Sequence, residues 1–183
     1  MPDSASVSED VKTIKYNLES AFDFYRRFIY NEELQVILAK HNFHSAGSVP
    51  SKIWEVFAAI LTGDEGKGGY GSDLTNHEVK SAKNGASFEY QYHLKAGKVK
   101  LEEDMTVNHI FISYSPDYKD VVVRLVEGSK LKEKFEEWRP GLIKNYDGPK
   151  PKQRYRKNIS YGFVKANGVL ILKTQDGDLV EAV

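Results

Sequence analysis

Apolar residues recur at helical spacing in three stretches of the first third of the chain. The first stretch follows a polar N-terminal arm and predicts one long amphipathic helix, whose apolar positions are Val11, Ile14, Leu18, Phe22, Tyr25 and Ile29. A shorter helix is expected over Glu32–His41. Residues 48–63 predict a third helix, because Pro50 suits a first helical turn and Gly63 suits a helix end.

The pattern changes to strands in the middle of the chain. Residues 87–94, 107–114 and 120–126 are rich in aromatic or β-branched side chains, and the last two runs are apolar on both faces, as central strands are. Residues 129–141 then predict a helix that ends at the Pro-Gly pair 140–141.

The last part of the chain combines basic residues with turn signals. Residues 144–158 predict a basic loop that contains proline, and strand-like runs with turn signals at 167–168 and 176–177 follow. Helices therefore come first, then a sheet with an embedded helix, then a β tail. This order indicates an α+β or mixed α/β fold in a single domain over residues 1–183.

Composition narrows the class of protein. The chain of 183 residues is 40% hydrophobic and 28% charged, which is ordinary for one globular domain. The absence of cysteine excludes disulfides, cysteine zinc sites and thiol catalysis. We find no signal-peptide pattern and no apolar run of the roughly 18 residues that a membrane span needs, so we expect a cytoplasmic protein without membrane contact.

Three charged residues lie close together in the glycine-rich run 68–85. If residues 75–76 form a two-residue hairpin turn, Asp73 lies opposite Glu78, and their Cβ atoms are roughly 4.5–5.5 Å apart. Strand alternation returns Lys80 to the same face. The pattern therefore predicts two carboxylates and an ammonium group around one point.

Such an arrangement suits a hard divalent ion. Two adjacent carboxylates repel each other unless a cation lies between them, and Mg²⁺ prefers oxygen ligands. Val79 would point into the core while its carbonyl group stays available to the metal. With Lys80 beside the ion, these groups could polarise a phosphodiester and orient a water molecule for attack. A solvated surface hairpin with a cross-strand ion pair would explain the same charges.

A second turn signal, Asn84-Gly85, predicts that the following strand returns beside this site. Three polar side chains would then share the face of the carboxylates: Glu89 opposite Lys80, Gln91 opposite Glu78, and His93 beyond them. Glu89 would be either a partner of Lys80 or a third acid. Gln and His side chains also offer donors and acceptors for the edges of DNA bases.

Basic side chains gather in the predicted loop 144–158, where they outnumber the single acid, Asp147. They are Lys144, Lys150, Lys152, Arg154, Arg156 and Lys157. We expect DNA phosphate contacts here, above all at the last four, because phosphate contacts supply affinity without reading sequence. Lys plus Arg and Asp plus Glu both number 26, so the net charge alone indicates no polyanionic partner.

The order of helix, acid, hairpin, Glu-x-Lys and buried strands resembles the PD-(D/E)XK nuclease superfamily. Within it the chain is most similar to the small homodimeric type II restriction endonucleases of the PvuII type, over about residues 50–170. Three segments carry the resemblance. Residues 65–82 contain a glycine-rich approach, an Asp and the run Glu-Val-Lys-Ser. Residues 91–93 are Gln-Tyr-His, and residues 121–139 are a strand followed by a Trp-bearing helix.

This resemblance implies an architecture. It implies a restriction-endonuclease-like central mixed β-sheet flanked by helices, with a helical and dimerisation segment (1–48), a catalytic core (49–140) and a basic loop with a β meander (141–183). The helix that ends at Ile29 is then a candidate dimer element.

The resemblance also implies an activity. Asp73 and Glu78 would bind Mg²⁺, and Lys80 would position or activate the attacking water. A homodimer would cut double-stranded DNA at a specific sequence and leave 5′-phosphate ends, and a cognate DNA methyltransferase is expected in the same system.

Several alternatives stay open. Asp64 or Glu65 could supply the acid in place of Asp73, whereas Glu55 is expected at the helix surface. His41 and His44 are expected to be a helix-end pair rather than a metal site. The chain could also be another nuclease of the superfamily, such as a junction resolvase or a phage or repair nuclease, or a non-catalytic DNA-binding module.

Overall fold

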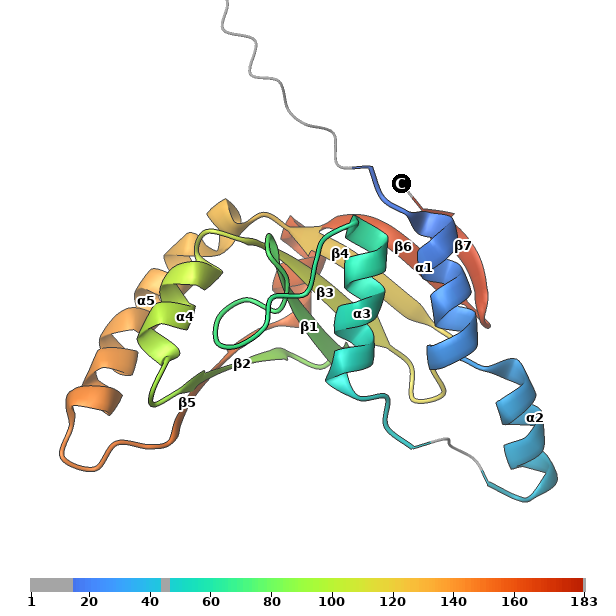
Figure 1. Ribbon diagram of the computed structural model, residues 1–183, viewed down its shortest axis with the longest axis horizontal. Coiled ribbons are helices and arrows are strands. Elements are labelled where there is room, and N and C mark those ends of the chain that lie inside the picture. Colours follow the sequence, from blue (N-terminus) through green and yellow to red (C-terminus); the bar gives the residue numbers. More distant parts are fainter. Residues whose placement is uncertain (1–14, 44–46, 183) are drawn as a thin grey trace, which may run out of the picture.

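A computed structural model of the chain describes residues 15–43 and 47–182 and shows a mixed α+β fold (Figure 1). A five-stranded sheet lies at its centre, with helices on its flanks. Its strands, in spatial order, are β1 (His77–Lys83), β3 (Asn108–Tyr114), β4 (Val121–Val126), β6 (Val169–Gln175) and β7 (Asp178–Ala182). Strands β1 and β3 are parallel and the other neighbours antiparallel, which confirms the expected mixed central sheet.

Strand β3 is buried on both faces, as its apolar sequence predicts. Ile110 and Ile112 face a core formed with the N-terminal helices, whereas Phe111 faces a second core formed with α4 (Gly97–Asp104) and α5 (Gly128–Asp147). The sheet therefore separates two apolar layers, and β1 at its edge lies where the two layers meet.

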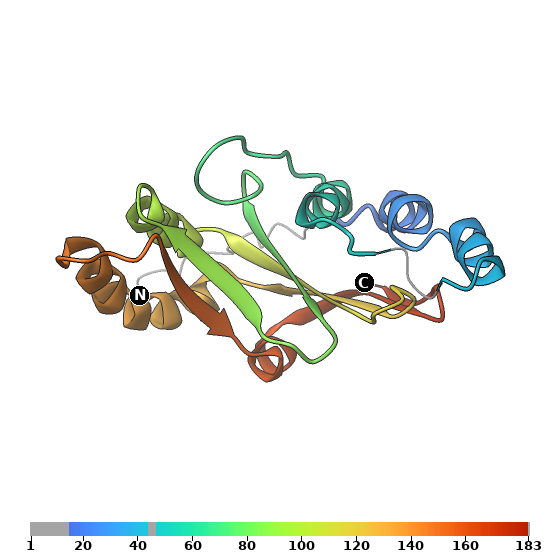
Figure 2. The same ribbon diagram turned by 90° about the horizontal axis from the view of Figure 1, so that it is seen from below.

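Strand β2 (Phe88–His93) does not join this sheet. It pairs antiparallel with β5 (Arg154–Ile159) in a two-stranded ribbon, which Figure 2 shows beside α4 and α5. The predicted hairpin ladder between β1 and β2 is therefore wrong. Gly85 does form a turn with φ 75°, but β1 bonds to the buried strand β3, and the aromatic face of β2 packs on α5.

The N-terminal helices cover one face of the sheet. In the described residues the expected long helix begins at Leu18, and residues 15–17 before it are not helical. The predicted beginning at Val11 lies outside the described residues. It consists of α1 (Leu18–Phe24) and a π-helical turn, η1 (Tyr25–Ile29). Two predicted helices are confirmed, α2 (Glu32–Lys40) and α3 (Ser51–Thr62), and α3 ends at Gly63 with φ 67°.

Two helices differ from the sequence prediction. Helix α4 has no predicted counterpart, because its mainly polar sequence lacks a clear apolar stripe. Helix α5 continues through Pro140, where we expected its end, because Leu142 beyond the proline is buried in the second core. None of the helices in the described part of the chain is long and apolar enough to cross a membrane.

The C-terminal part also corrects two predictions. The residues expected as basic loop begin within α5 and end in β5, so only 148–153 are loop. The first strand-like run of the tail is a helix, α6 (Tyr161–Asn167), whose N-terminus is capped by the Ser160 hydroxyl accepting from Phe163 N–H at 3.2 Å. The turn at 176–177 is confirmed, and it joins β6 to β7.

Candidate active site

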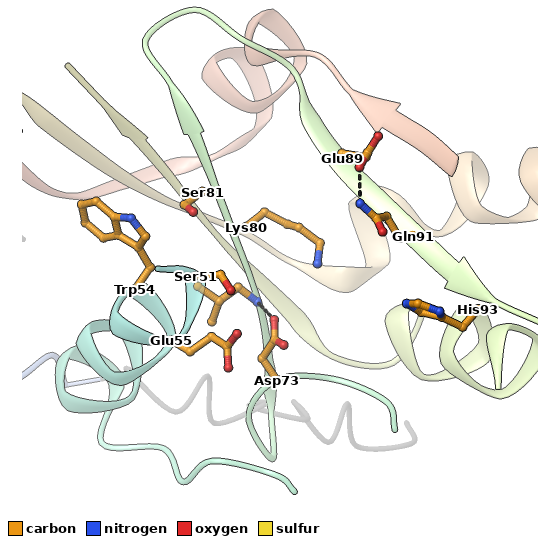
Figure 3. Close-up of a pocket in the computed structure, with 10 residues that line it drawn as sticks. Ser51, Trp54, Glu55, Asp73, Lys80, Ser81, Glu89, Gln91 and His93 are labelled. Atoms are coloured by element: carbon orange, nitrogen blue, oxygen red, sulfur yellow. Dashed lines mark hydrogen bonds between the residues drawn. The ribbon is translucent and has the colours of Figure 1, made fainter. Parts of the chain in front are cut away.

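A cavity of about 450 Å³ opens between α3, β1 and β2 (Figure 3). Its lining is mostly polar and comes from segments far apart in the sequence. The lining residues are Ser51, Trp54, Glu55, Asp73, Val79, Lys80, Ser81, Glu89, Gln91 and His93. Six of the residues expected in the site thus face one cavity: Asp73, Val79, Lys80, Glu89, Gln91 and His93.

The turn before β1 brings Asp73 and Glu78 together. Leu74 N–H donates to the His77 carbonyl at 2.9 Å, as expected for a tight turn at residues 75–76. Asp73 N–H donates to Glu78 Oε2 at 3.1 Å, and Asp73 Oδ2 accepts from Val79 N–H, also at 3.1 Å. The two carboxylates are therefore fixed by backbone groups of each other's segment, although residues 72–74 form no regular strand.

Asp64, one of the alternative acids, stabilises this turn through hydrogen bonds and does not line the cavity. Its carboxylate accepts from Asn76 N–H at 2.8 Å and contacts His77 Nδ1 at 2.8 Å. Glu65, the other alternative acid, is exposed, and its backbone carbonyl accepts from Thr75 N–H at 2.9 Å. Asp73 is the acid of this segment that lines the cavity.

Glu78 is completely buried and surrounded by positive charge. Its Oε1 contacts Lys80 Nζ directly and Lys100 Nζ at 2.7 Å, and both lysine side chains are less than one-fifth exposed, at 16% and 17%. Burial alone would raise the pKa of Glu78, but these ammonium groups outweigh burial and lower the pKa to about 2. Glu78 is therefore an anion at neutral pH, although it has no contact with solvent.

Asp73 has the opposite electrostatics. Burial and the neighbouring charge of Glu78 raise the pKa of Asp73 to about 6. Negative charge at Asp73 is thus unfavourable in this site, and a cation bound beside it would relieve that cost.

Glu55 corrects the expectation of a surface residue. It lines the cavity from α3, its side chain is only 14% exposed, and its charge contributes to the raised pKa of Asp73. Figure 3 shows the Glu55 and Asp73 carboxylates on the same side of the cavity. This position could not be assigned to the inner side of α3 from sequence, because the i, i+3 spacing of Lys52 and Glu55 is typical of a surface ion pair.

Two further residues were missed altogether. Lys100 and Asp104 lie one turn apart on α4, with Lys100 Nζ 3.3 Å from Asp104 Oδ1, and Asp104 also accepts from Tyr92 O–H at 2.9 Å. Burial raises the pKa of Asp104, whereas the carboxylates of Asp104 and Glu78 outweigh burial and raise the pKa of Lys100. The four-residue spacing was the only sequence signal, and it was too weak without a predicted helix.

The ribbon formed by β2 and β5 presents its polar face beside the cavity. In the ladder, Glu89 lies opposite Asn158, Gln91 opposite Arg156, and His93 opposite Arg154. The aromatic residues between them, Phe88, Tyr90 and Tyr92, are buried on the other face as predicted. The polar side chains also bond to one another.

These bonds differ from the predicted cross-strand contacts. Glu89 contacts Gln91 and lies 3.6 Å from Arg156, so it does not hold Lys80. Arg154 Nη1 donates to Gln91 Oε1 at 3.2 Å. The Gln91 side chain is therefore held from both sides.

The expected basic contacts separate into two groups. Arg154 and Arg156 are exposed on the same face as Gln91, because they alternate along β5. Lys157 points to the opposite face, 5.6 Å from the Tyr155 ring, and Lys152 lies in the exposed loop before β5. The structure therefore brings the two arginines to the cavity side of the ribbon and does not bring Lys157 there.

No family model matches this chain, and no curated protein is significantly similar to it. The chemistry of the cavity is therefore the main evidence on function.

Among residues 15–43 and 47–182, no three Asp, Glu or His side chains gather closely enough to hold a metal ion by themselves. Asp73 in the cavity lining and Glu78 buried beside it nevertheless suit a hard divalent cation. Asp73 and Glu78 are adjacent carboxylates, and the ammonium groups at Glu78 Oε1 show that this oxygen attracts positive charge.

Proposed function

We propose that this protein is a Mg²⁺-dependent endodeoxyribonuclease of the PD-(D/E)XK type. Within that class we propose a type II restriction endonuclease that acts as a homodimer on double-stranded DNA. The observation that carries the proposal is the cluster of Asp73, Glu78 and Lys80. Asp73 and Lys80 line a polar cavity, Glu78 is buried in contact with both, and the two acids are hydrogen-bonded through backbone groups of each other's segment. A solvated hairpin would leave these charges exposed, and here Glu78 is fully buried.

Asp73 and Glu78, with the Val79 carbonyl, would hold the Mg²⁺ ion. When bound, the ion would polarise the scissile phosphate and lower the pKa of a bound water. Backbone groups of the chain would hold the two acids in place for the ion. Asp73 is positioned for this by Val79 N–H, and Glu78 by Asp73 N–H.

Lys80 is the group that would act on the attacking water. Its Nζ lies against Glu78 and 4.9 Å from the centre of the Tyr90 ring, so the ammonium is held at the cavity wall. From there it would orient the water and stabilise negative charge that develops on the phosphate oxygens. The product would carry a 5′-phosphate and a 3′-hydroxyl.

The ribbon supports the choice of DNA as the substrate. A two-stranded β-ribbon fits the major groove of B-DNA, and Gln and Arg side chains are suited to adenine and guanine edges respectively. Gln91, Arg154 and Arg156 lie on one face of the ribbon, and Gln91 also lines the cavity. Base reading and cutting would then take place on neighbouring surfaces.

Digestion of mixed plasmid and phage DNA with Mg²⁺ tests this function. Discrete, reproducible fragments are expected from the purified protein, and EDTA should abolish them. Smeared products or cutting confined to branched DNA would favour a repair nuclease or a junction resolvase. No cutting of any of these DNAs, with DNA binding intact, would favour a non-catalytic DNA-binding module.

Two parts of the proposal are tested separately. Light scattering should give twice the chain mass of 20.8 kDa if the protein is a homodimer. A cognate DNA methyltransferase that protects the same DNA from digestion would support the restriction function over other nucleases.

A further inference from the structure

Lys100 is bound to Glu78 from outside the segment that carries the proposed catalytic residues. Its Nζ lies 2.7 Å from Glu78 Oε1, 2.9 Å from the Gly71 carbonyl and 3.3 Å from Asp104 Oδ1. The residue therefore links α4, the glycine-rich loop and β1 at one point.

The hydrogen-bonding capacity of Glu78 is largely used in this arrangement. Oε1 contacts both lysine ammonium groups, and Oε2 accepts from Asp73 N–H. A divalent ion that binds Oε1 must therefore displace at least one ammonium group, because like charges repel strongly in a buried site.

Lys100 also contacts the Gly71 carbonyl and the Asp104 carboxylate, which can bind its ammonium group in the absence of Glu78. Asp104 is completely buried on the same helix, and its Oδ1 is already within ion-pair distance of Lys100. In the described part of the chain Lys80 has an ion pair with Glu78 alone, and its ammonium group otherwise lies over the face of Tyr90. The charge of Lys80 acts on Asp73 and Asp104 only from beyond ion-pair distance. Asp104 can therefore retain the Lys100 ammonium group in an ion pair when that group no longer contacts Glu78.

We propose that Lys100 is a positioning residue that competes with the divalent ion for Glu78, and that Asp104 retains the displaced ammonium group. The inference rests on the proposed metal site at Asp73 and Glu78. In the metal-free protein Lys100 holds Glu78 in place, and in the metal-bound protein the Lys100–Asp104 pair is the closer one. Metal affinity would then depend on two residues that do not touch the metal.

The alternative is a purely structural ion pair that stabilises α4. The two possibilities differ in the sign of the effect on metal binding. Removing Lys100 charge should tighten Mg²⁺ binding if it competes, whereas neutralising Asp104 should weaken it, because Lys100 would then bind Glu78 alone. A structural role predicts weaker binding, or no change, for both.

Calorimetric titration of the purified proteins with Mg²⁺ at pH 8.5, without DNA, separates these outcomes. Lys100→Met should bind Mg²⁺ about tenfold more tightly than wild type, and Asp104→Asn about tenfold more weakly, as expected for one nearby charge. Lys98→Met is the matched control, since Lys98 lies on the same helix but pairs with exposed Asp147. Its affinity should equal that of wild type.

If Lys100→Met does not fold, the double variant Lys100→Met/Asp104→Asn removes both charges and carries the test. It should bind Mg²⁺ about tenfold more tightly than Asp104→Asn alone. Equal or weaker binding in that comparison, or shifts of the same sign in the two single variants, would overturn the inference while leaving the metal site intact. Failure of the wild-type protein to bind Mg²⁺ would instead overturn the proposed function, and the inference with it.

Discussion

Strands β1 and β2 line the same cavity, but they differ in how deeply their polar side chains are buried and in what those side chains contact. On β1, Glu78 is fully buried and its oxygens are bound by two lysines and a backbone amide. On β2, Glu89 is exposed and Gln91 half-buried, and their partners are side chains of the ribbon. The β1 side of the cavity, with Asp73 and Lys80 in its lining and Glu78 buried beside them, is therefore a buried charged wall, and the β2 side is a solvated polar wall.

The difference indicates separate roles. Burying a carboxylate is costly unless it is paired, and even paired buried charges add little net stability. The arrangement around Glu78 is therefore better explained by chemistry than by folding. Exposed side chains on the ribbon carry little such cost and remain free to exchange their mutual bonds for bonds to a ligand. We accordingly propose that β1 carries the groups for cutting and the ribbon those for DNA reading.

The largest expected effect is on the buried wall. Lys80→Ala should slow DNA cutting by about a hundredfold to a thousandfold or more, because it removes the group that orients water and stabilises developing charge. DNA binding, followed by gel shift with Ca²⁺ in place of Mg²⁺, should change little. Lys83→Ala is the control, since Lys83 ends the same strand in solvent. Equal activity of the two variants would break the assignment of cutting to β1.

Asp73 should make the stability of the metal-free protein depend on pH. The folded-state pKa of Asp73 is about 6, above its ordinary value of 3.8, so the folded protein binds this proton more tightly than the unfolded chain. Ionised Asp73 therefore destabilises the metal-free fold above about pH 6, and this penalty fades as pH falls from 6 to 4.

Asp73→Asn should consequently stabilise the metal-free protein at pH 7.5 by about 1–2 kcal/mol, and by almost nothing at pH 4. Urea unfolding at the two pH values measures this difference. Asp147→Asn, at an exposed position, should change stability little at either pH. A destabilising effect of Asp73→Asn at pH 7.5 would show that ionised Asp73 does not lower the free energy of unfolding of the metal-free protein.

A smaller effect is expected on the solvated wall. Gln91→Ala should weaken binding of the target DNA by about 1–3 kcal/mol and relax its sequence specificity, without loss of folding stability. The fragment pattern of a digest and a gel shift with Ca²⁺ measure the two changes. Gln175→Ala, at an exposed position on β6, is the control. An unchanged pattern with Gln91→Ala would remove this residue from DNA reading.

The smallest expected effect distinguishes the two faces of the ribbon. If Arg154 contacts a phosphate, Arg154→Ala should reduce the slope of log affinity against log salt by about 0.9. Lys157→Ala should leave the slope unchanged, because Lys157 lies on the opposite face. Equal changes for both would mean that DNA does not lie along the cavity side of the ribbon.

The parts of the site that depend on local chain geometry were predictable from sequence. Asp73 and Glu78 meet because a tight turn separates them, and Lys80 follows by strand alternation. The partners of β1 and β2 were not predictable, because pairing with β3 and β5 depends on which apolar surfaces are covered elsewhere in the fold.

The same limit applies to single residues. Lys100 reaches Glu78 only because α4 packs beside β1, and no local pattern encodes that contact. Glu55 faces the cavity because the apolar side of α3 is fixed by the sheet beneath it. Pro140 favoured a helix end locally, but the buried Leu142 beyond it favours continuation of α5.

The most direct test of the account compares wild type with Glu78→Gln in one plasmid digest, with Mg²⁺ and with EDTA. Gln keeps the size of Glu78, and its single oxygen can still accept from the two lysines, but it removes the charge that would bind the ion. We predict discrete fragments from wild type with Mg²⁺ only, and none from a folded Glu78→Gln protein. Equal cutting by both proteins, or no cutting by wild type of any DNA tested, would contradict the assignment of a metal-dependent nuclease site to β1.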